Sequence, residues 1–119
     1  MSLAAEETVA FRMTLDPGQA EAYRQRHDDI WPELTQALIT AGVIDYRIWL
    51  DPQSHHLFAV LRRRVDHTLD QLPDTELMRR WWAMMADIMQ THPDNVPVQV
   101  DLMPIFHLEA PARPGSGDA

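Results

Sequence analysis

Tyr23 and His27 are the side chains of this sequence whose types and spacing best suit proton transfer. They lie four positions apart in a segment with helical periodicity, so one helix face would carry both a phenol and an imidazole. An imidazole with an unperturbed pKa of about 6.5 takes and gives protons at neutral pH, as general acid/base catalysis requires. The same spacing also fits a buried, hydrogen-bonded structural histidine, and the sequence leaves both interpretations open.

Three further aromatic residues could line a ligand site. Trp81 and Trp82 are adjacent in a helical segment, so their rings point about 100° apart and cannot share one face. One indole ring could therefore stack on a sugar or another flat ligand, while Tyr46 could direct its hydroxyl into a cavity. Ordinary packing is the alternative for each, since the two tryptophans lie in a methionine-rich helical stripe and Tyr46 fits the edge of a core.

The composition argues against several other chemistries. The sequence has no cysteine, and all ten basic residues are arginine, which excludes thiol nucleophiles, thiolate metal sites, disulfides and catalytic lysines. Serine occurs only at positions 2, 54 and 116, and two of the four glycines lie near the C-terminus. A serine nucleophile or a glycine-rich phosphate loop is therefore not expected. The six histidines lack the i,i+4 spacing of common zinc motifs, so we expect no metal site.

Length and charge limit the class of protein. A chain of 119 residues supports a single hydrophobic core, and 45% hydrophobic with 24% charged residues is typical of a soluble globular domain. A net charge of −8 disfavours nucleic acid as a partner. The first residues do not resemble a signal peptide, and no apolar segment approaches the roughly 20 residues of a membrane span. We therefore expect a cytoplasmic protein that does not enter a membrane.

The elements that must position these side chains alternate between two periodicities. Apolar residues two apart predict strands over 9–15, 44–50, 57–65 and 98–107, and spacings of three and four predict helices over 20–30, 32–41 and 74–89. Asp16 and Pro17 are predicted to begin the first helix, as N-cap and first helical residue. Pro32 separates the first two helices, and Gly42 ends the second.

This order of elements is β, α, β, β, α, β with a broken first helix, which is typical of the α+β ferredoxin-like fold. We expect one domain over residues 8–109 and a disordered C-terminal tail over 110–119, which is rich in proline and glycine. Helices cover only one face of such a sheet, yet the predicted strands carry apolar residues on both faces. The second face should therefore pack against a second copy, in a dimeric α/β barrel, or form a ligand pocket.

Four segments resemble the L-rhamnose mutarotase family in content, order and spacing. They are residues 23–34 (YRQRHDDIWPEL), 46–51 (YRIWLD), 80–89 (RWWAMMADIM) and 93–98 (PDNVPV). The resemblance extends from about residue 11 to residue 106. It implies a homodimeric enzyme, working without a cofactor, that interconverts the α and β anomers of L-rhamnopyranose. It also implies that His27 is the catalytic residue and that the sugar contacts Tyr23, Tyr46, Trp81 and Trp82.

The implied reaction agrees with the residues present. Anomer exchange needs a proton for the ring oxygen, which His27 would donate, and the removal of a proton from the anomeric hydroxyl. The opened sugar then rotates about C1–C2 and its ring closes again. It needs no nucleophile, metal or redox centre. The group that removes the anomeric proton is left open among Asp87, His92, Asp94 and water.

Two alternative functions fit the same fold. One is a dimeric barrel monooxygenase or haem-binding protein, in which His27 would bind the haem iron. The other is a non-catalytic dimer that binds a small ligand. Within the mutarotase hypothesis, the sugar range among rhamnose, fucose and related 6-deoxy sugars also stays open, because the shape of the pocket decides it.

Overall fold

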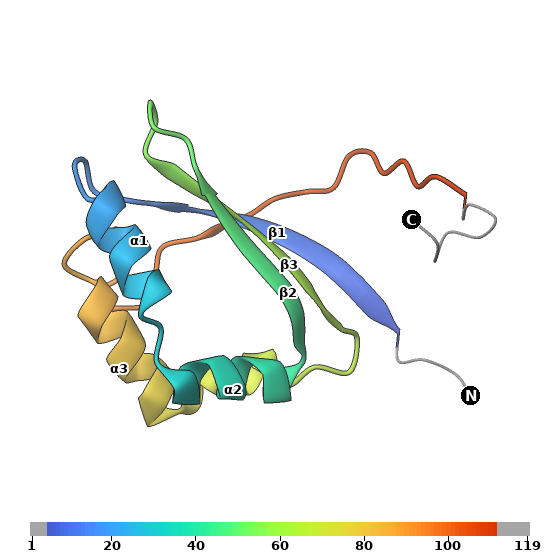
Figure 1. Cartoon of the computed structure of the whole chain (residues 1–119), viewed down its shortest axis with the longest axis horizontal. Coiled ribbons are helices and arrows are strands. Elements are labelled where there is room, and N and C mark those ends of the chain that lie inside the picture. Colours follow the sequence, from blue (N-terminus) through green and yellow to red (C-terminus); the bar gives the residue numbers. More distant parts are fainter. Residues whose placement is uncertain (1–4, 112–119) are drawn as a thin grey trace.

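The computed structural model describes residues 5–111, in which helices cover one face of a four-stranded antiparallel sheet (Figure 1). The elements in chain order are β1 (Glu6–Thr14), α1 (Ala20–Asp28), α2 (Pro32–Ala41), β2 (Val43–Leu50), β3 (His56–Arg64), the 3-10 helix η1 (Leu69–Asp74), α3 (Glu76–Met85) and β4 (Val100–Asp101). The strand order is β2-β3-β1-β4, which confirms the predicted ferredoxin-like fold with its broken first helix. Within the described range, no helix is long and apolar enough to cross a membrane.

Strand β1 lies inside the sheet, between β3 and β4. It pairs with β3 over its whole length, from Glu6 opposite Arg64 to Thr14 opposite His56. Because side chains alternate along a strand, every second residue of β1 and β3 faces the helices. These strand residues form the core together with the inward faces of the helices and with residues that follow β1 and α3. The buried members are Met13, Leu15, Tyr23, Leu34, Leu57, Ala59, Met78, Trp81, Met85, Ile88 and Met89.

The predicted start of the first helix is wrong by a few residues. Asp16 and Pro17 belong to a turn in which Gly18 has a φ of +80°, and the N–H of Gln19 donates to the Asp16 carbonyl at 3.3 Å. Helix α1 begins only at Ala20, without a side-chain cap. This turn reverses the direction of the chain after β1, so that α1 lies on the face of the sheet.

The predicted boundaries of the second helix are confirmed. Pro32 is the first residue of α2, and Trp31 before it has an extended ψ of 132°, as the proline ring requires. Gly42 ends the helix with a φ of +125°, a conformation that suits glycine. A Cβ at this position would lie 2.7 Å from the Cβ of His67, so close packing also favours glycine.

The predicted third helix, over 74–89, is too long. Helix α3 extends from Glu76 to Met85. The Thr75 hydroxyl caps its N-terminus by accepting a hydrogen bond from the N–H of Met78. The chain then returns to the end of β1, where Asp16 N–H donates to the Ile88 carbonyl at 2.9 Å. Gln90 N–H likewise donates to the Thr14 carbonyl of β1 at 3.0 Å, and not to a carbonyl within the helix.

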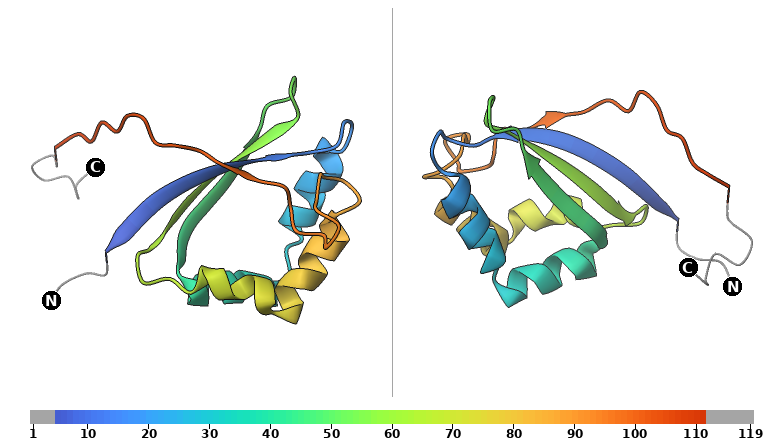
Figure 2. Two further views of the ribbon diagram at one scale, coloured as in Figure 1. Left: turned by 180° about the vertical axis from the view of Figure 1, so that it is seen from behind. Right: turned by 45° about the horizontal axis from the view of Figure 1, so that its top comes forward.

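The predicted last strand, over 98–107, pairs with β1 only at Val100 and Asp101. Beyond it, residues 102–111 form an extended segment, here called the C-terminal arm, which projects from the body (Figures 1 and 2). Met103, Ile105 and Phe106 are 79–85% exposed because no neighbouring strand lies beside them in this chain. Of the predicted tail, residues 112–119 lie outside the described range, and the domain bounds 8–109 stay a prediction.

The face of the sheet that points away from the helices is uncovered and partly apolar. Trp49 on β2 is 54% exposed and lies opposite Phe58 on β3. Phe58 and Val60 are half-buried, and Val100 of β4 is exposed. The prediction that both faces of the sheet carry apolar residues is therefore confirmed.

Candidate functional site

Helix α1 brings Tyr23 and His27 together on its inner face, as their spacing predicts. The two rings stack with centroids 4.3 Å apart and planes inclined by 30°. Tyr23 belongs to the buried core and His27 is half-buried. The edge of the imidazole also contacts Trp81 of α3, with centroids 5.4 Å apart and planes nearly perpendicular. The proposed acid/base group thus lies where α1 faces α3.

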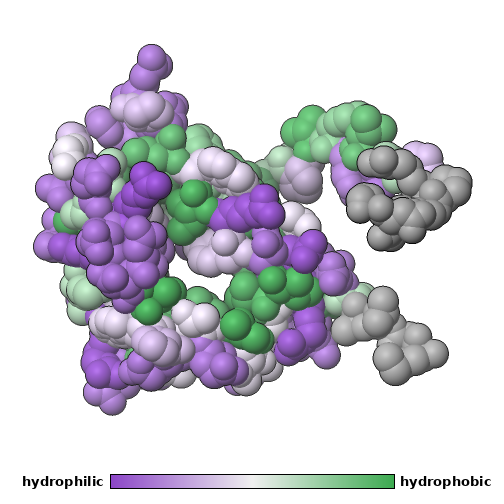
Figure 3. Space-filling view, in the orientation of Figure 1, coloured by the Kyte–Doolittle hydropathy of each residue, from purple (hydrophilic) through white to green (hydrophobic). Residues whose placement is uncertain are grey.

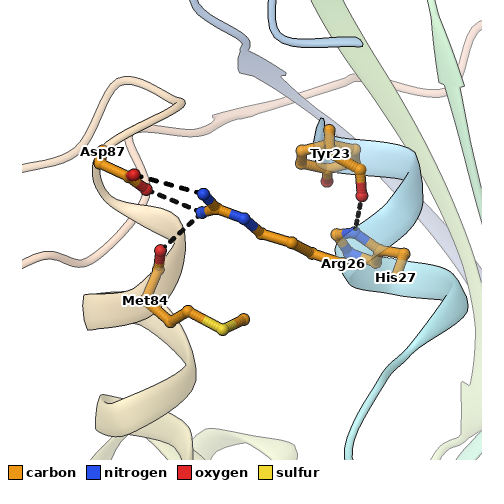
Figure 4. Close-up of polar contacts among 5 residues, drawn as sticks. All are labelled: Tyr23, Arg26, His27, Met84 and Asp87. Carbon is orange, nitrogen blue, oxygen red and sulfur yellow. Dashed lines mark hydrogen bonds and ion pairs between the residues drawn. The ribbon is translucent and has the colours of Figure 1, made fainter. Parts of the chain in front are cut away.

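One hydrogen bond fixes the tautomer of His27. Its Nδ1 lies 2.9 Å from the backbone carbonyl oxygen of Tyr23 (Figure 4). A carbonyl oxygen can only accept, so Nδ1 carries the proton and Nε2 has the free lone pair in the neutral ring. Burial lowers the pKa of His27 below its usual value, although the bond to Tyr23 and the charge of Asp28 oppose this shift. His27 is therefore neutral at pH 7 and presents Nε2 as a base.

The two adjacent tryptophans have different environments. Trp81 is only 6% exposed and packs edge-on against Trp31, with centroids 5.2 Å apart, as well as against His27. Trp82 is half-buried, and both rings border the same cleft. Trp81 is thus a core residue that also forms a wall of the site, whereas Trp82 is the indole that a ligand reaches more easily.

Tyr46 reaches the site from the sheet. Its ring lies 6.4 Å from that of Phe11, and 40% of its surface is open to solvent because it borders the cleft. The surrounding protein atoms nevertheless raise its pKa to about 12. Burial, and secondarily the phenol of Tyr46, raise the pKa of Tyr23 as well. Both hydroxyls are therefore protonated at neutral pH and can donate and accept hydrogen bonds.

All five predicted site residues line one open cleft between the sheet and the helices, with a volume of about 1840 Å³. Figure 3 shows openings between the strands and the helices, with apolar side chains at their borders. Ligand pockets usually occupy about 300–1,000 Å³, so this cleft is wider than a closed sugar site. The extra volume arises because it continues along the sheet to the C-terminal arm, where Met103 and Phe106 border it.

The three residues considered for removing the anomeric proton do not line the cleft. Asp87 points to Arg26, and His92 and Asp94 lie in the turn that follows α3. The structure therefore brings together the five predicted site residues and leaves these three outside. Within residues 5–111 no group of three or more His, Asp or Glu side chains could hold a metal ion.

Two residues near the site could not be identified from the sequence. Arg26 of α1 donates to the Met84 carbonyl and forms a two-pronged ion pair with Asp87, and Trp31 packs on Trp81. Both contacts join parts of the chain that are far apart in sequence, so spacing along the chain could not reveal them.

The fold and the cleft define a small ferredoxin-like protein with an aromatic site suited to a small hydroxylated ligand. The model of the L-rhamnose mutarotase family matches residues 8–108. An L-rhamnose mutarotase from Burkholderia orbicola (strain MC0-3) is 61% identical over 103 residues, covering 87% of this chain and 99% of that protein. Another from Paraburkholderia phytofirmans is 59% identical over 104 residues, covering 87% and 97%. The chain belongs to the L-rhamnose mutarotase family.

Solved structures agree with this assignment. The crystal structure of an L-rhamnose mutarotase from Formosa agariphila has a TM-score of 0.80 and 44% sequence identity, covering 87% of this chain and 99% of that one. A structure described as an antibiotic biosynthesis monooxygenase from Bacteroides thetaiotaomicron has a TM-score of 0.52 at 14% identity, covering 89% and 96%. The second similarity concerns the fold alone.

Proposed function

We propose that this protein is an isomerase that interconverts the α and β anomers of L-rhamnopyranose, by general acid/base catalysis at His27. Membership of the family supports the substrate and the reaction. One observation supports the role of His27: its Nδ1 proton is bound by the Tyr23 carbonyl, which leaves Nε2 as a free base in an aromatic cleft.

The proposed reaction uses a single nitrogen. Nε2 takes the proton of the anomeric hydroxyl, the C1–O5 bond breaks, and the resulting imidazolium donates that proton to the ring oxygen. Both oxygens are bonded to C1, so one nitrogen can reach each in turn. The open-chain aldehyde then rotates about C1–C2, and the same transfers in reverse close the other anomer. No second side-chain base is needed, which agrees with the position of Asp87, His92 and Asp94 outside the cleft.

The other site residues would bind and orient the sugar. Tyr23 and Tyr46 approach from the helix and from the sheet, and their protonated hydroxyls suit the sugar's hydroxyl groups. The half-buried ring of Trp82 suits stacking on an apolar face of the sugar. Trp81 would support His27 through their edge contact.

The two tryptophans are expected to respond differently to replacement by alanine. Trp82→Ala should raise KM for L-rhamnose about 5- to 30-fold, the equivalent of about 1–2 kcal/mol of lost stacking, with little loss of stability. Trp81→Ala should lower the free energy of unfolding by about 3–5 kcal/mol because it empties a core position. Kinetics and denaturant unfolding of both variants test this. Equal losses of stability would contradict the assignment.

Activity is expected to fall in acid. Burial lowers the pKa of His27 below 6.5, so kcat/KM should be constant near pH 7 and decline as pH falls through that lower value, where protonation removes the base. Tyr23 and Trp81, which contact the ring, stay uncharged in this range, and Arg26 stays charged. Asp28→Asn removes a charge that raises the pKa, so the decline should begin at a lower pH. A decline that moves to higher pH in this variant would contradict the assignment.

The function itself is tested by saturation-transfer proton NMR on L-rhamnose with a small amount of protein. Irradiation of one anomeric proton signal should reduce the other only when protein is present. L-fucose measured in parallel reports the sugar range. If L-rhamnose, L-fucose and related 6-deoxy sugars all show no protein-dependent magnetisation transfer, the proposal is wrong. Haemin titration, followed by its visible absorption, then tests the haem-binding alternative.

We also propose that the protein is a homodimer. The C-terminal arm carries apolar side chains with about four-fifths of their surface exposed, and the uncovered sheet face presents Trp49 and Val100. The alternating pattern over 98–107 is that of a strand, yet a single chain pairs only two of these residues. A second copy related by two-fold symmetry would supply the missing neighbour to both arms at once.

A further inference from the structure

A single guanidinium joins the two helices that carry most of the proposed site. Arg26 Nη1 donates to the carbonyl oxygen of Met84 at 2.7 Å and to Asp87 Oδ1 at 2.7 Å, and its Nη2 donates to Asp87 Oδ2 at 3.2 Å (Figure 4). Within the described part of the chain, these are the only side-chain hydrogen bonds between α1 and the end of α3. Figures 1 and 2 show α1 and α3 side by side.

The acceptors explain why the guanidinium sits there. Met84 lies in the last turn of α3, where backbone carbonyls lack partners within the helix and the helix dipole favours a positive charge. That turn contains no basic residue of its own. Asp87 holds the flat guanidinium by two parallel bonds, and Arg26 in turn lowers the pKa of the Asp87 carboxyl. Arg26 thus fills a capping position that α3 leaves open.

The position of Arg26 on α1 links this cap to the site. Arg26 precedes His27, so its side chain leaves the helix about 100° away from the imidazole, and it does not line the cleft. His27 is held on one side by its own helix, through the Tyr23 carbonyl, and on the other by Trp81 of α3. Any movement of α1 relative to α3 would therefore move Nε2 relative to the sugar.

We propose that Arg26 is a positioning residue, which fixes α1 against the end of α3 and thereby sets the place of His27 beside Trp81. Arg26 acts through these contacts and does not touch the sugar. The kinetic part of the inference rests on the proposed mutarotase function.

Kinetics of three variants test the proposal. Arg26→Ala should lower kcat about 10- to 100-fold, because a misplacement near 1 Å has this cost, while KM changes much less. Arg26→Lys should restore only part of kcat, since its ammonium can donate to the Met84 carbonyl and one Asp87 oxygen but cannot form the two parallel bonds of the guanidinium. Asp87→Asn should have a smaller effect than Arg26→Ala, because the bond to Met84 remains. Wild-type kcat in Arg26→Ala would overturn the proposal.

A matched control distinguishes the positioning role of Arg26 from a general loss of stability. Arg64 also binds a carboxylate and a backbone carbonyl, those of Asp66 and Thr40, but lies away from α1. Arg64→Ala should therefore keep the wild-type kcat. If Arg26→Ala does not fold, Asp87→Asn decides: a reduced kcat at unchanged thermal stability supports the proposal, and an unchanged kcat overturns it.

A second measurement is independent of activity. The rings of Trp81 and Tyr23 both displace the proton NMR signals of the His27 ring, which are assigned by their absence in His27→Asn, and only the Trp81 contribution depends on how α1 lies against α3. In Arg26→Ala these signals should move toward the position of a free histidine, and in Arg64→Ala they should stay. Unmoved signals in Arg26→Ala would overturn the positioning role. This test holds even if the wild-type protein exchanges no anomers, a result that would reject the proposed function alone.

Discussion

Replacing His27 by asparagine is expected to lower kcat for anomer exchange by about 10²- to 10⁴-fold, the usual contribution of one positioned acid/base group. The asparagine amide can still donate to the Tyr23 carbonyl, so the local structure should persist while the titratable Nε2 is lost. The rate is measured by saturation-transfer NMR on L-rhamnose. Circular dichroism and thermal unfolding verify that the variant is folded.

A matched control for this variant lies in the β2–β3 turn. His55 has a φ of +65°, a conformation that asparagine adopts readily, and it does not line the cleft. His55→Asn should therefore leave both rate and stability unchanged. A full rate in His27→Asn would show that another group moves the proton.

Placing aspartate at both Ile105 and Phe106 is expected to convert the proposed dimer to a monomer. Each of these apolar side chains contributes about 1.5–3 kcal/mol when buried, and a two-fold dimer buries two from each chain. The loss is therefore about 6 kcal/mol or more, which raises Kd by about four powers of ten. Sedimentation velocity over a range of concentrations measures the change.

The exposed arm can be changed without disturbing the core of its own chain. Its side chains make few contacts within their own chain, so the double variant should remain folded. Ile39→Asp on α2 is the control: Ile39 is an exposed isoleucine, at 51%, that lies far from the arm, so this variant should leave the proposed dimer intact. A wild-type protein that sediments as a monomer would reject the dimer, and a dimeric double variant would reject the role of the arm.

Local signals in the sequence predict most of the elements, and the two largest errors, in α3 and in the last strand, occur where distant segments meet. Pro32 and Gly42 define α2 because their backbone preferences act within the helix itself. The predicted last strand is too long because alternation shows that a segment can pair but does not supply a neighbouring strand. The predicted α3 is too long for a similar reason, since the segment after Met85 forms its backbone bonds with Thr14 and Asp16, which are distant in sequence.

The same distinction applies to the site. The four-residue spacing of Tyr23 and His27 predicts their shared face, which the stacked rings confirm. Their roles as catalytic and sugar-binding residues stay predictions. The contact of His27 with Trp81 and the bonds of Arg26 depend on how α1 and α3 pack, which local periodicity does not encode. The bond that fixes the tautomer of His27 is local, but it depends on a rotamer of the side chain.

The central place of β1 in the sheet has a consequence for the order in which the chain folds. The β2–β3 hairpin joins neighbouring segments, whereas β1 must pair with β3 and then with β4, where Phe11 lies opposite Asp101. Such distant pairings form slowly. During synthesis, His27 leaves the ribosome long before Trp81, and the return of the chain to β1 comes later still. The complete cleft therefore exists only after nearly the whole chain has been made, so an incomplete chain should have no sugar site.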